Sequence, residues 1–215
     1  MKSVLILGAG NFGSMLARQM NEQSYEIMIV DVRESLVNAV MPYVTDAQIG
    51  DCTNPNFLRS LGVSNYDLCV VTISENFQTS LETTSLLKEL GAKQVIARAK
   101  NEIQEKFLLR NGADEVVYPE KQVALRLATK YASEKILDFM QFDGGYSIYE
   151  MAIPAEWEGK TLPQLDVRRK YDINLIALRR NGSVSIPRAD DPFRKDDVVY
   201  AVGEMKKLYK CFHIR

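Results

Sequence analysis

Three glycines and an aspartate carry the clearest chemistry in this chain of 215 residues. Gly8, Gly10 and Gly13 form the spacing G-x-G-x-x-G after an apolar run, and a second apolar run ends in Asp31. The first glycine allows a tight turn, the second lets the backbone approach a diphosphate, and the third lets a helix pack closely on a strand. Helix-start N–H groups attract phosphate, and the carboxylate can accept hydrogen bonds from ribose hydroxyls. The pattern predicts a nucleotide site.

Further polar residues follow later apolar runs, where the ligands of parallel sheets bind. Asp51 and Thr53 could face the adenosine half of a nucleotide, and the alternative is a solvated loop in which Asp51 caps the next helix. The stretch 72–76 is a short polar turn that can line the nucleotide. Arg98 is a candidate phosphate partner, because a guanidinium pairs with phosphate bidentately, and surface pairing is the alternative.

Glu120 is a candidate metal ligand, because a carboxylate there could hold a divalent ion such as Mg²⁺ or Ca²⁺ against phosphate oxygens. The alternative is a helix-start charge that the helix dipole favours. The charge of Asp31 would repel a ribose 2′-phosphate, so NADP is not expected. The residues predicted to contact the nucleotide are Gly8, Gly10, Asn11, Phe12, Gly13, Asp31, Val32, Asp51, Cys52, Thr53, Thr72, Ile73, Asn76 and Arg98.

The overall composition excludes several classes of protein. The 27 basic and 28 acidic residues are mixed along the chain, which disfavours binding to nucleic acid or to a membrane surface through charge. No apolar stretch has the length of a membrane span and no signal-peptide pattern is present, so a cytoplasmic protein is expected. Its three cysteines, Cys52, Cys69 and Cys211, are widely spaced and are predicted to be reduced core residues.

A dehydrogenase would need a general acid or base near the nicotinamide, and the sequence offers poor candidates. The single histidine, His213, is three residues from the end, and Tyr131 precedes Lys135 in a helical stretch outside the nucleotide domain. The sequence therefore favours a protein that binds a nucleotide without turnover, not an enzyme.

Alternating strand and helix patterns must position these residues. Strands are expected over 4–7, 27–30, a short run ending at 50–51, 68–73, 94–97 and 115–118, with helices over 11–22, 35–42, 57–61, 76–90 and 102–111. Six strands that alternate with helices predict an α/β fold with a Rossmann-like, doubly wound parallel sheet.

The stretch 120–142 is predicted to be one long helix with apolar residues on more than one face. We favour a crossover helix that is buried against a second subunit, and a helix between two domains of one chain is the alternative. The glycines of Asp143-Gly144-Gly145 suggest a domain boundary. The expected division is a nucleotide-binding lobe over 1–119, the helix over 120–143, and a small α+β lobe over 144–215.

In the last lobe, strands are expected over 148–153, 173–178, 183–186 and 198–202, with a hairpin turn at Asn181-Gly182. Helical segments are expected over 161–171 and 204–209. A module of about seventy residues often needs a partner to be stable.

Nearly the whole chain resembles the regulators of potassium conductance (RCK), specifically the Ktr/Trk potassium-uptake regulatory subunits. The resemblance rests on GAGNFG with Asp31, IGDCTN, VVTISENFQTSLETTSLLKELGAKQVIARA, GADEVVYPEK, and INLIALRRNG followed by PRADDPFRKDDVVYAVG. It implies a non-catalytic subunit that binds ATP, ADP or NAD(H) and dimerises through the crossover helix. Such subunits assemble into tetramers or octameric rings beneath a potassium-translocating membrane subunit of the TrkH/KtrB type, at the inner face of the membrane.

Two details of the resemblance concern ligand choice. Many ATP-responsive members have arginine where this chain has Asn11, and losing that cation removes a charge-assisted contact to the terminal phosphate. The carboxyl-terminal lobe of several relatives binds cyclic di-AMP, and Arg169, Ile173 and Asn174 match that region loosely.

Two functional hypotheses remain. The first is a regulator of a channel or transporter that responds to an adenine nucleotide. The second is a small NAD-dependent oxidoreductase or redox sensor with Cys52 near the nucleotide.

Overall fold

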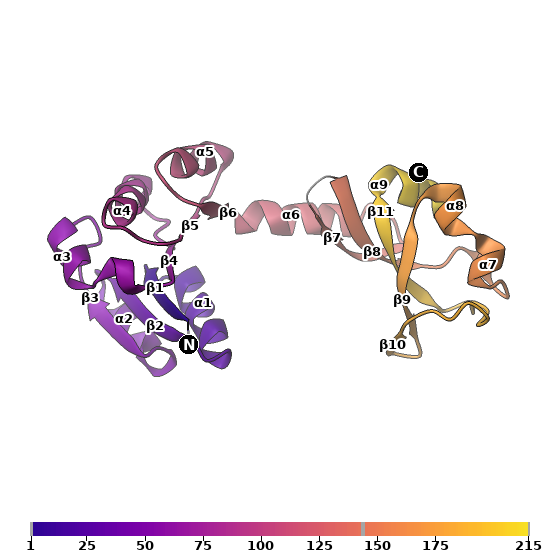
Figure 1. Cartoon of the computed structure of the whole chain (residues 1–215), viewed down its shortest axis with the longest axis horizontal. Helices are drawn as coiled ribbons and strands as arrows, with labels where there is room; N and C mark the ends of the chain where they lie inside the picture. Colours follow the sequence, from indigo (N-terminus) through magenta and orange to yellow (C-terminus); the bar gives the residue numbers. More distant parts are fainter. Residues whose placement is uncertain (1, 143–144, 215) are drawn as a thin grey trace. The chain divides into compact units, whose positions relative to one another are not determined.

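The computed structural model of the chain describes residues 2–142 and 145–214. The chain forms two compact units, Met1–Lys121 and Gln122–Arg215. Figure 1 labels their helices and strands in chain order. Each unit has its own sheet and its own cluster of buried apolar side chains, so each has the core that an independent domain needs.

The first unit contains a parallel sheet of six strands in the order β3-β2-β1-β4-β5-β6. The strands are β1 (Ser3–Leu7), β2 (Glu26–Asp31), β3 (Asp46–Ile49), β4 (Leu68–Val71), β5 (Val95–Arg98) and β6 (Glu115–Val117). The helices between them are α1 (Asn11–Glu22), α2 (Glu34–Val40), α3 (Pro55–Ser60), α4 (Phe77–Glu89) and α5 (Glu102–Arg110). Since β4 lies on the opposite side of β1 from β2, the strand order reverses there, and the predicted doubly wound fold is confirmed.

Alternating side chains of β1 serve the two faces of this sheet. Val4 and Ile6 belong to one apolar cluster, which includes side chains of α1 and α2. Leu5 and Leu7 belong to the other, which includes side chains of α3, α4 and α5. All four are fully buried, as expected for a central strand covered by helices on both faces.

The prediction of one helix over 120–142 was wrong. Helix α6 covers Pro119–Lys130, and β7 begins at Ile136. A turn separates them, in which the Ser133 side chain accepts a hydrogen bond from Lys135 N at 3.2 Å. Strand β7 then pairs antiparallel with β8, and Phe139 stacks on Tyr149 with 5.5 Å between ring centroids. Some of the apolar residues predicted to spread around the helix, such as Phe139 and Met140, belong instead to β7. They form a strand because they pair with β8, which lies further along the chain.

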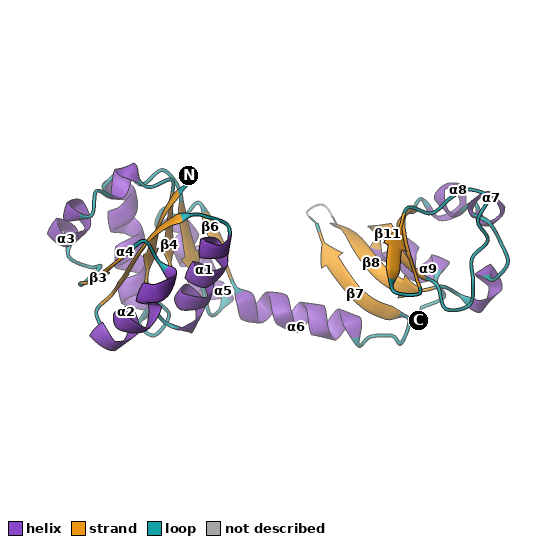
Figure 2. Ribbon diagram, turned by 90° about the horizontal axis from the view of Figure 1, so that it is seen from below, coloured by secondary structure: helices purple, strands orange, loops and turns teal. Residues whose placement is uncertain are grey.

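The second unit contains an antiparallel sheet of five strands in the order β10-β9-β11-β8-β7. The strands are β7 (Ile136–Gln141), β8 (Tyr146–Ala152), β9 (Asn174–Arg180), β10 (Ser183–Ser185) and β11 (Val198–Glu204). The helices α7 (Leu162–Leu165), α8 (Val167–Tyr171) and α9 (Met205–Cys211) gather at one side of this sheet in Figure 2. The helical segment predicted over 161–171 is two short helices, since Asp166 has a left-handed φ of 49°.

The predicted domain boundary at 143–145 lies partly outside the described residues. The strands that flank it, β7 and β8, pair with each other and belong to the same unit. The two compact units instead divide within α6, between Lys121 and Gln122.

Aromatic side chains fill the core of the second unit. The Trp157 ring lies 5.7 Å from that of Phe193 and 5.0 Å from that of Phe212, between centroids.

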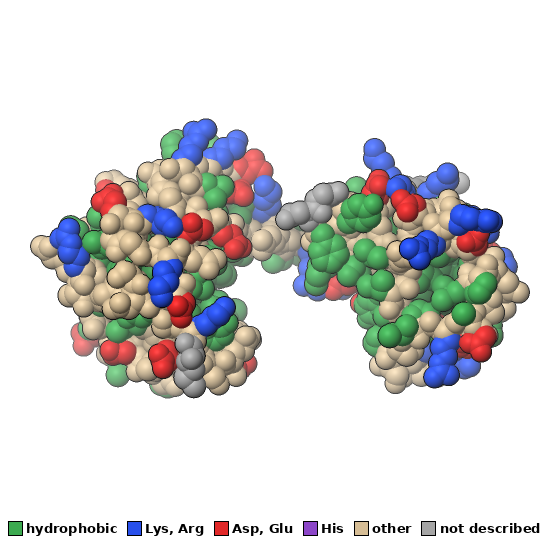
Figure 3. All heavy atoms as spheres, in the orientation of Figure 1, with side chains coloured by type: hydrophobic (Ala, Val, Ile, Leu, Met, Phe, Trp, Pro, Cys, Tyr) green, Lys and Arg blue, Asp and Glu red, His purple; other side chains and the backbone are tan. Residues whose placement is uncertain are grey.

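The surface of the second unit presents apolar side chains to solvent, among them Met140 and Val184, which are 61% and 59% exposed. Figure 3 shows hydrophobic side chains gathered over this unit. In the described residues, no helix combines the length and apolar character required to cross a bilayer.

Candidate functional site

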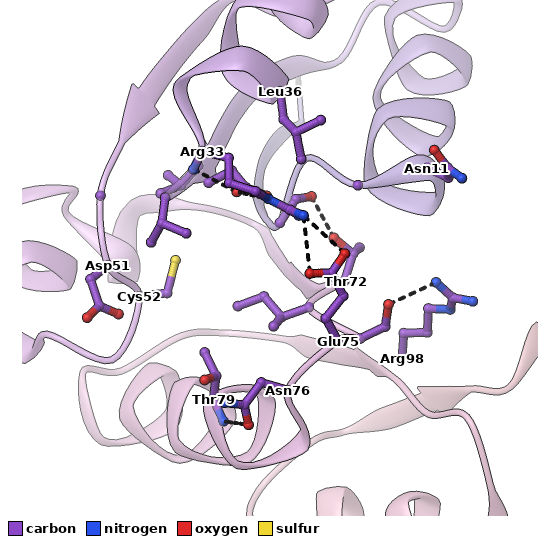
Figure 4. Close-up of a pocket in the computed structure, with 18 of the residues that line it drawn as sticks. Asn11, Arg33, Leu36, Asp51, Cys52, Thr72, Glu75, Asn76, Thr79 and Arg98 are labelled. Carbon is purple, nitrogen blue, oxygen red and sulfur yellow. Dashed lines mark hydrogen bonds and ion pairs between the residues drawn. The ribbon is translucent and has the colours of Figure 1, made fainter.

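A cleft of about 550 Å³ opens in the first unit where β1, β2, β4 and β5 end (Figure 4). Its position at the carboxyl ends of the strands, next to the reversal of strand order, is where doubly wound sheets bind ligands. Eleven of the fourteen residues predicted to contact a nucleotide line it: Gly8, Gly10, Asn11, Asp31, Val32, Asp51, Cys52, Thr72, Ile73, Asn76 and Arg98.

The three glycines of the turn have different structural roles. Gly8 has a φ of +111°, and a Cβ there would lie 2.8 Å from the Thr72 hydroxyl. A Cβ on Gly13 would lie 2.0 Å from the Gly8 carbonyl oxygen, so Gly13 allows α1 to pack against the turn and does not line the cleft. A Cβ on Gly10 would meet nothing within 4 Å. The space beside Gly10 therefore leaves room for a ligand to approach the backbone.

Thr72 fixes the turn from the end of β4. Its side chain is buried, and its hydroxyl oxygen lies 2.6 Å from the Gly8 carbonyl oxygen and 3.1 Å from that of Leu7. Its backbone N–H also donates to Leu7 at 2.8 Å. Strand β4 therefore holds the glycine turn in place on one side of the cleft.

The Asp31 carboxylate lies at the end of β2 and is only 6% exposed. It accepts hydrogen bonds from Ala9 N at 2.8 Å, from Arg33 N at 2.9 Å and from Arg33 Nε at 3.1 Å. Burial alone would raise the pKa of Asp31, but the hydrogen bonds from Arg33 and Ala9 outweigh it and hold this pKa below its ordinary value. Asp31 is therefore a charged acceptor that borders the cleft.

Arg98, at the end of β5, supplies positive charge to the cleft. Its Nη2 lies 2.5 Å from Glu120 Oε1, and its guanidinium carbon lies 5.2 Å from the centroid of the Phe12 ring. Its buried Nε has no hydrogen-bond partner among the described residues. Phe12 and Glu120 are thus neighbours of Arg98, and neither lines the cleft.

Glu120 was predicted to hold a metal ion, and the structure pairs it with Arg98. Hydrogen bonds from its own backbone N–H and from Arg98 hold the pKa of Glu120 below its ordinary value, although partial burial opposes this. Over residues 2–142 and 145–214, no group of three or more His, Cys, Asp and Glu side chains is arranged to hold a metal ion. The described protein groups alone do not make a metal site.

Asp51 and Thr53 form a local turn after β3. Asp51 Oδ1 accepts hydrogen bonds from both the backbone N–H and the hydroxyl of Thr53, each at 2.8 Å. The alternative role of Asp51 as the cap of α3 belongs to Asn54, whose side chain accepts from Asn56 N at 3.0 Å. Asp51 lines the cleft and Thr53 does not.

Cys52 lies in the cleft lining but is only 4% exposed. Burial, together with the nearby charges of Asp51 and Asp31, raises the pKa of its thiol to about 12. Reactive and redox-sensing cysteines have accessible thiols with lowered pKa values, so this environment opposes the redox-sensor hypothesis.

Several cleft residues were missed by sequence analysis. They are Val30, Arg33, Leu36, Gly50, Thr79 and Lys100, while Ser74 and Glu75 lie in the predicted polar turn over 72–76. Arg33 and Lys100 each follow the last residue of a strand by two positions. The rule that ligands bind beyond the carboxyl ends of strands would have identified both.

The three residues proposed for a ligand site in the carboxyl-terminal lobe differ in accessibility. Ile173 is 1% exposed and belongs to the apolar core. Arg169 is exposed and pairs with Asp166 at 2.8 Å, and Asn174 is exposed at the start of β9. Only two of the three side chains are therefore available to a ligand.

Comparison with known proteins agrees with this architecture. The TrkA-N domain model matches residues 4–119, and the TrkA-C domain model matches residues 148–211. Ktr system potassium uptake protein C of Bacillus subtilis is 35% identical over 96% of this chain and 94% of its own length. Ktr system potassium uptake protein A of the same organism is 32% identical over the same shares of the two chains.

A solved structure shows a related fold. The GsuK channel bound to NAD matches with a TM-score of 0.67 and 16% identity, over 99% of this chain and 39% of that chain. The chain thus spans about two fifths of that protein. Together, the two matched domains and the identity to the Bacillus proteins over almost the full length confirm the predicted resemblance, and the chain belongs to the Ktr/TrkA family of potassium uptake proteins.

Proposed function

We propose that this protein is a non-catalytic regulatory subunit of a potassium uptake system or channel, and that it gates the membrane subunit in response to a bound adenine nucleotide. The observation that carries the proposal is the cleft in which the glycine turn, Asp31 and Arg98 converge. The family supports the potassium-uptake assignment, because the Bacillus relatives are named as Ktr system proteins.

The cleft suits a nucleotide of the ATP, ADP or NAD(H) class. The open space beside Gly10 and the start of α1 would receive phosphates, since helix-start N–H groups favour anions. Asp31 would accept the ribose hydroxyls, and Arg98 and Lys100 line the same cleft with positive charge. Residues from three strand ends therefore offer groups for the phosphates and the ribose. Asn11 carries no charge with which to read the terminal phosphate, so the choice between ATP and ADP would depend on the cations that line the cleft.

The divalent ion suggested for Glu120 receives no support from the described residues. Mg²⁺ and Ca²⁺ require several oxygen ligands, and Glu120 is paired with Arg98. A metal there would depend on phosphate oxygens of the nucleotide.

Helix α6 supports a proposed homodimer. Within the helix, Val123, Leu125 and Leu127 are 55%, 47% and 49% exposed, and Tyr131, directly after it, is 78% exposed. Exposing these apolar side chains to water costs free energy, and packing against the same helix of a second copy would bury them. We propose that such dimers assemble into a tetramer or octameric ring, which acts at the inner face of the membrane through a potassium-translocating partner.

We also propose a second ligand site in the carboxyl-terminal lobe. Arg169 and Asn174 are exposed and could contact cyclic di-AMP, while Ile173 could contribute only after the core rearranged. Titration of the full chain with cyclic di-AMP, compared between wild type and Arg169→Ala, tests this site. Equal affinity of the two proteins would exclude Arg169.

The proposed function is tested by denaturing freshly purified protein and identifying the released nucleotide by chromatography. We expect ATP, ADP or NAD(H), and a thermal shift when the emptied protein is supplied with the same compound. Release of a flavin or NADPH, or steady oxidation of NADH by the protein, would contradict the proposal. An empty site with no thermal shift from ATP, ADP or NADH would exclude nucleotide gating.

A further inference from the structure

Arg33 occupies an unexpected position in the cleft. It follows Asp31 by two residues, and its side chain reaches across the cleft to Glu75, in the loop after β4 (Figure 4). Arg33 Nη1 lies 3.0 Å from Glu75 Oε1 and 3.2 Å from Oε2, while Arg33 Nε lies 3.1 Å from Asp31 Oδ1. One guanidinium therefore joins an acid at the end of β2 to an acid in the loop after β4.

These contacts fill the acceptor capacity of Asp31. Oδ1 receives Arg33 N and Nε, and Oδ2 receives Ala9 N at 2.8 Å with Arg33 Nη2 at 3.4 Å. A carboxylate has about four lone-pair positions for hydrogen bonds. No position remains for a ribose diol, which would donate two hydrogen bonds.

A ribose can bind Asp31 only if an existing donor leaves. The two backbone donors, Ala9 N and Arg33 N, are fixed by the glycine turn and by the end of β2. The Arg33 guanidinium is the donor that can move, because its side chain is 44% exposed. Its other partner, Glu75, is 77% exposed, and exposed ion pairs are held weakly and screened by salt.

We propose that Arg33 is a displaceable occupant of the ribose position, anchored by Glu75, and that it sets how strongly the site discriminates ligands by their ribose hydroxyls. The proposal rests on the nucleotide site proposed above and adds its specificity. A ligand with an intact cis-diol replaces the guanidinium at Asp31, whereas a ligand without the diol leaves the guanidinium in place. The presence of Arg33 thereby reduces the net binding free energy that a ligand gains from its two ribose hydroxyls.

The test measures the affinities of ADP and 2′,3′-dideoxy-ADP by calorimetry on the full chain after removal of bound nucleotide. The measured quantity is the ratio of the dideoxy-ADP Kd to the ADP Kd. Arg33→Met removes the charge and keeps the aliphatic length, and this ratio should rise about tenfold over wild type, as expected when a bond to a charged group is freed. Glu75→Gln removes the anchor and should raise the ratio about threefold.

Arg59→Met is the matched control, because Arg59 is exposed on α3 and donates to Asn56 outside the cleft. Its ratio should equal that of wild type. An unchanged or reduced ratio in Arg33→Met, with ADP still bound, overturns the role of Arg33 and leaves the nucleotide site intact. Should Arg33→Met fail to fold, an unchanged ratio in Glu75→Gln has the same meaning. If wild type binds no adenine nucleotide, the proposed function itself fails, and this inference fails with it.

Discussion

Each of the two units contains a buried aspartate held by an arginine, and the two pairs have different surroundings. Asp31 in the first unit borders an open cleft, and its partner Arg33 is nearly half exposed. Asp197 in the second unit is 1% exposed and accepts two hydrogen bonds from Arg180, at 2.8 Å and 2.7 Å, and one from Arg194 N at 2.8 Å.

The difference shows how the same pair of residue types can serve binding or stability. Burial opposes the charge of Asp197, yet Arg180 and Arg194 N hold its pKa below the ordinary value. Arg180 is itself tied to Asp191 at 2.7 Å and is 17% exposed, so neither member of the pair has room to move. We therefore expect the Asp197 pair to contribute stability, and the Asp31 pair to exchange partners as proposed above.

The largest expected effect comes from Gly13→Ala in the first unit. The added Cβ would lie 2.0 Å from a backbone oxygen of the turn, so α1 or the turn must shift. We expect a loss of more than about 5 kcal/mol in the free energy of unfolding of this unit. Hydrogen exchange followed by mass spectrometry should show lost protection in β1 and α1 and unchanged protection in β8 and β11. Normal protection in β1 would contradict the packing role of Gly13.

Asp197→Ala should be the most damaging single change of a charged residue in the second unit. It leaves Arg180 partly buried without its main partner, and breaking a buried pair in this way costs about 3–5 kcal/mol. Protection against hydrogen exchange should fall in β9 and β11, while the ADP affinity of the first unit stays at the wild-type value. The matched control is Glu102→Ala, whose exposed pair with Lys121 lies in the other unit. A loss of ADP affinity in Asp197→Ala would remove the distinction between the two pairs.

Gly10→Ala separates binding from folding within the first unit. The backbone φ of Gly10 is −66° and its Cβ would meet open space, so the unit should fold with nearly wild-type stability. The methyl group would enter the space proposed for phosphates and should weaken ADP binding about tenfold or more. Calorimetry and a thermal melt measure the two effects. Wild-type affinity in this variant would place the phosphates elsewhere.

The pH dependence of stability should reveal the Asp197 pair. Because the folded-state pKa is lowered, its stabilisation is present above the unfolded-state pKa of about 4 and is lost as pH falls through the folded-state pKa. The difference in unfolding free energy between wild type and Asp197→Ala should therefore be constant at neutral pH. Below about pH 4 it should shrink by up to about 1.4 kcal/mol per pH unit. A difference that persists unchanged at acid pH would mean that packing, not charge, is lost in the variant.

The first unit could be predicted from the sequence more completely than the second. Glycine spacing and buried strands such as Leu68–Val71 are local signals, and together they gave the sheet and most of the cleft lining. The strand β7 was mistaken for helix because its pairing with β8 is a tertiary contact that periodicity does not contain. The contact between Arg33 and Glu75 spans 42 residues and was missed for the same reason.

The Thr72 hydroxyl has a consequence for the evolution of this cleft. It has a single proton to share between two carbonyl oxygens, those of Leu7 and Gly8, beside the space where an anion would bind. Valine, which matches threonine in shape, would fill the same volume but leave the Gly8 oxygen without that proton, while the Leu7 oxygen would keep its bond from the backbone N–H of residue 72. A hydroxyl at position 72, from threonine or serine, is thus what satisfies the Gly8 carbonyl oxygen beside the space proposed for phosphates, which restricts the side chains that this position can accept.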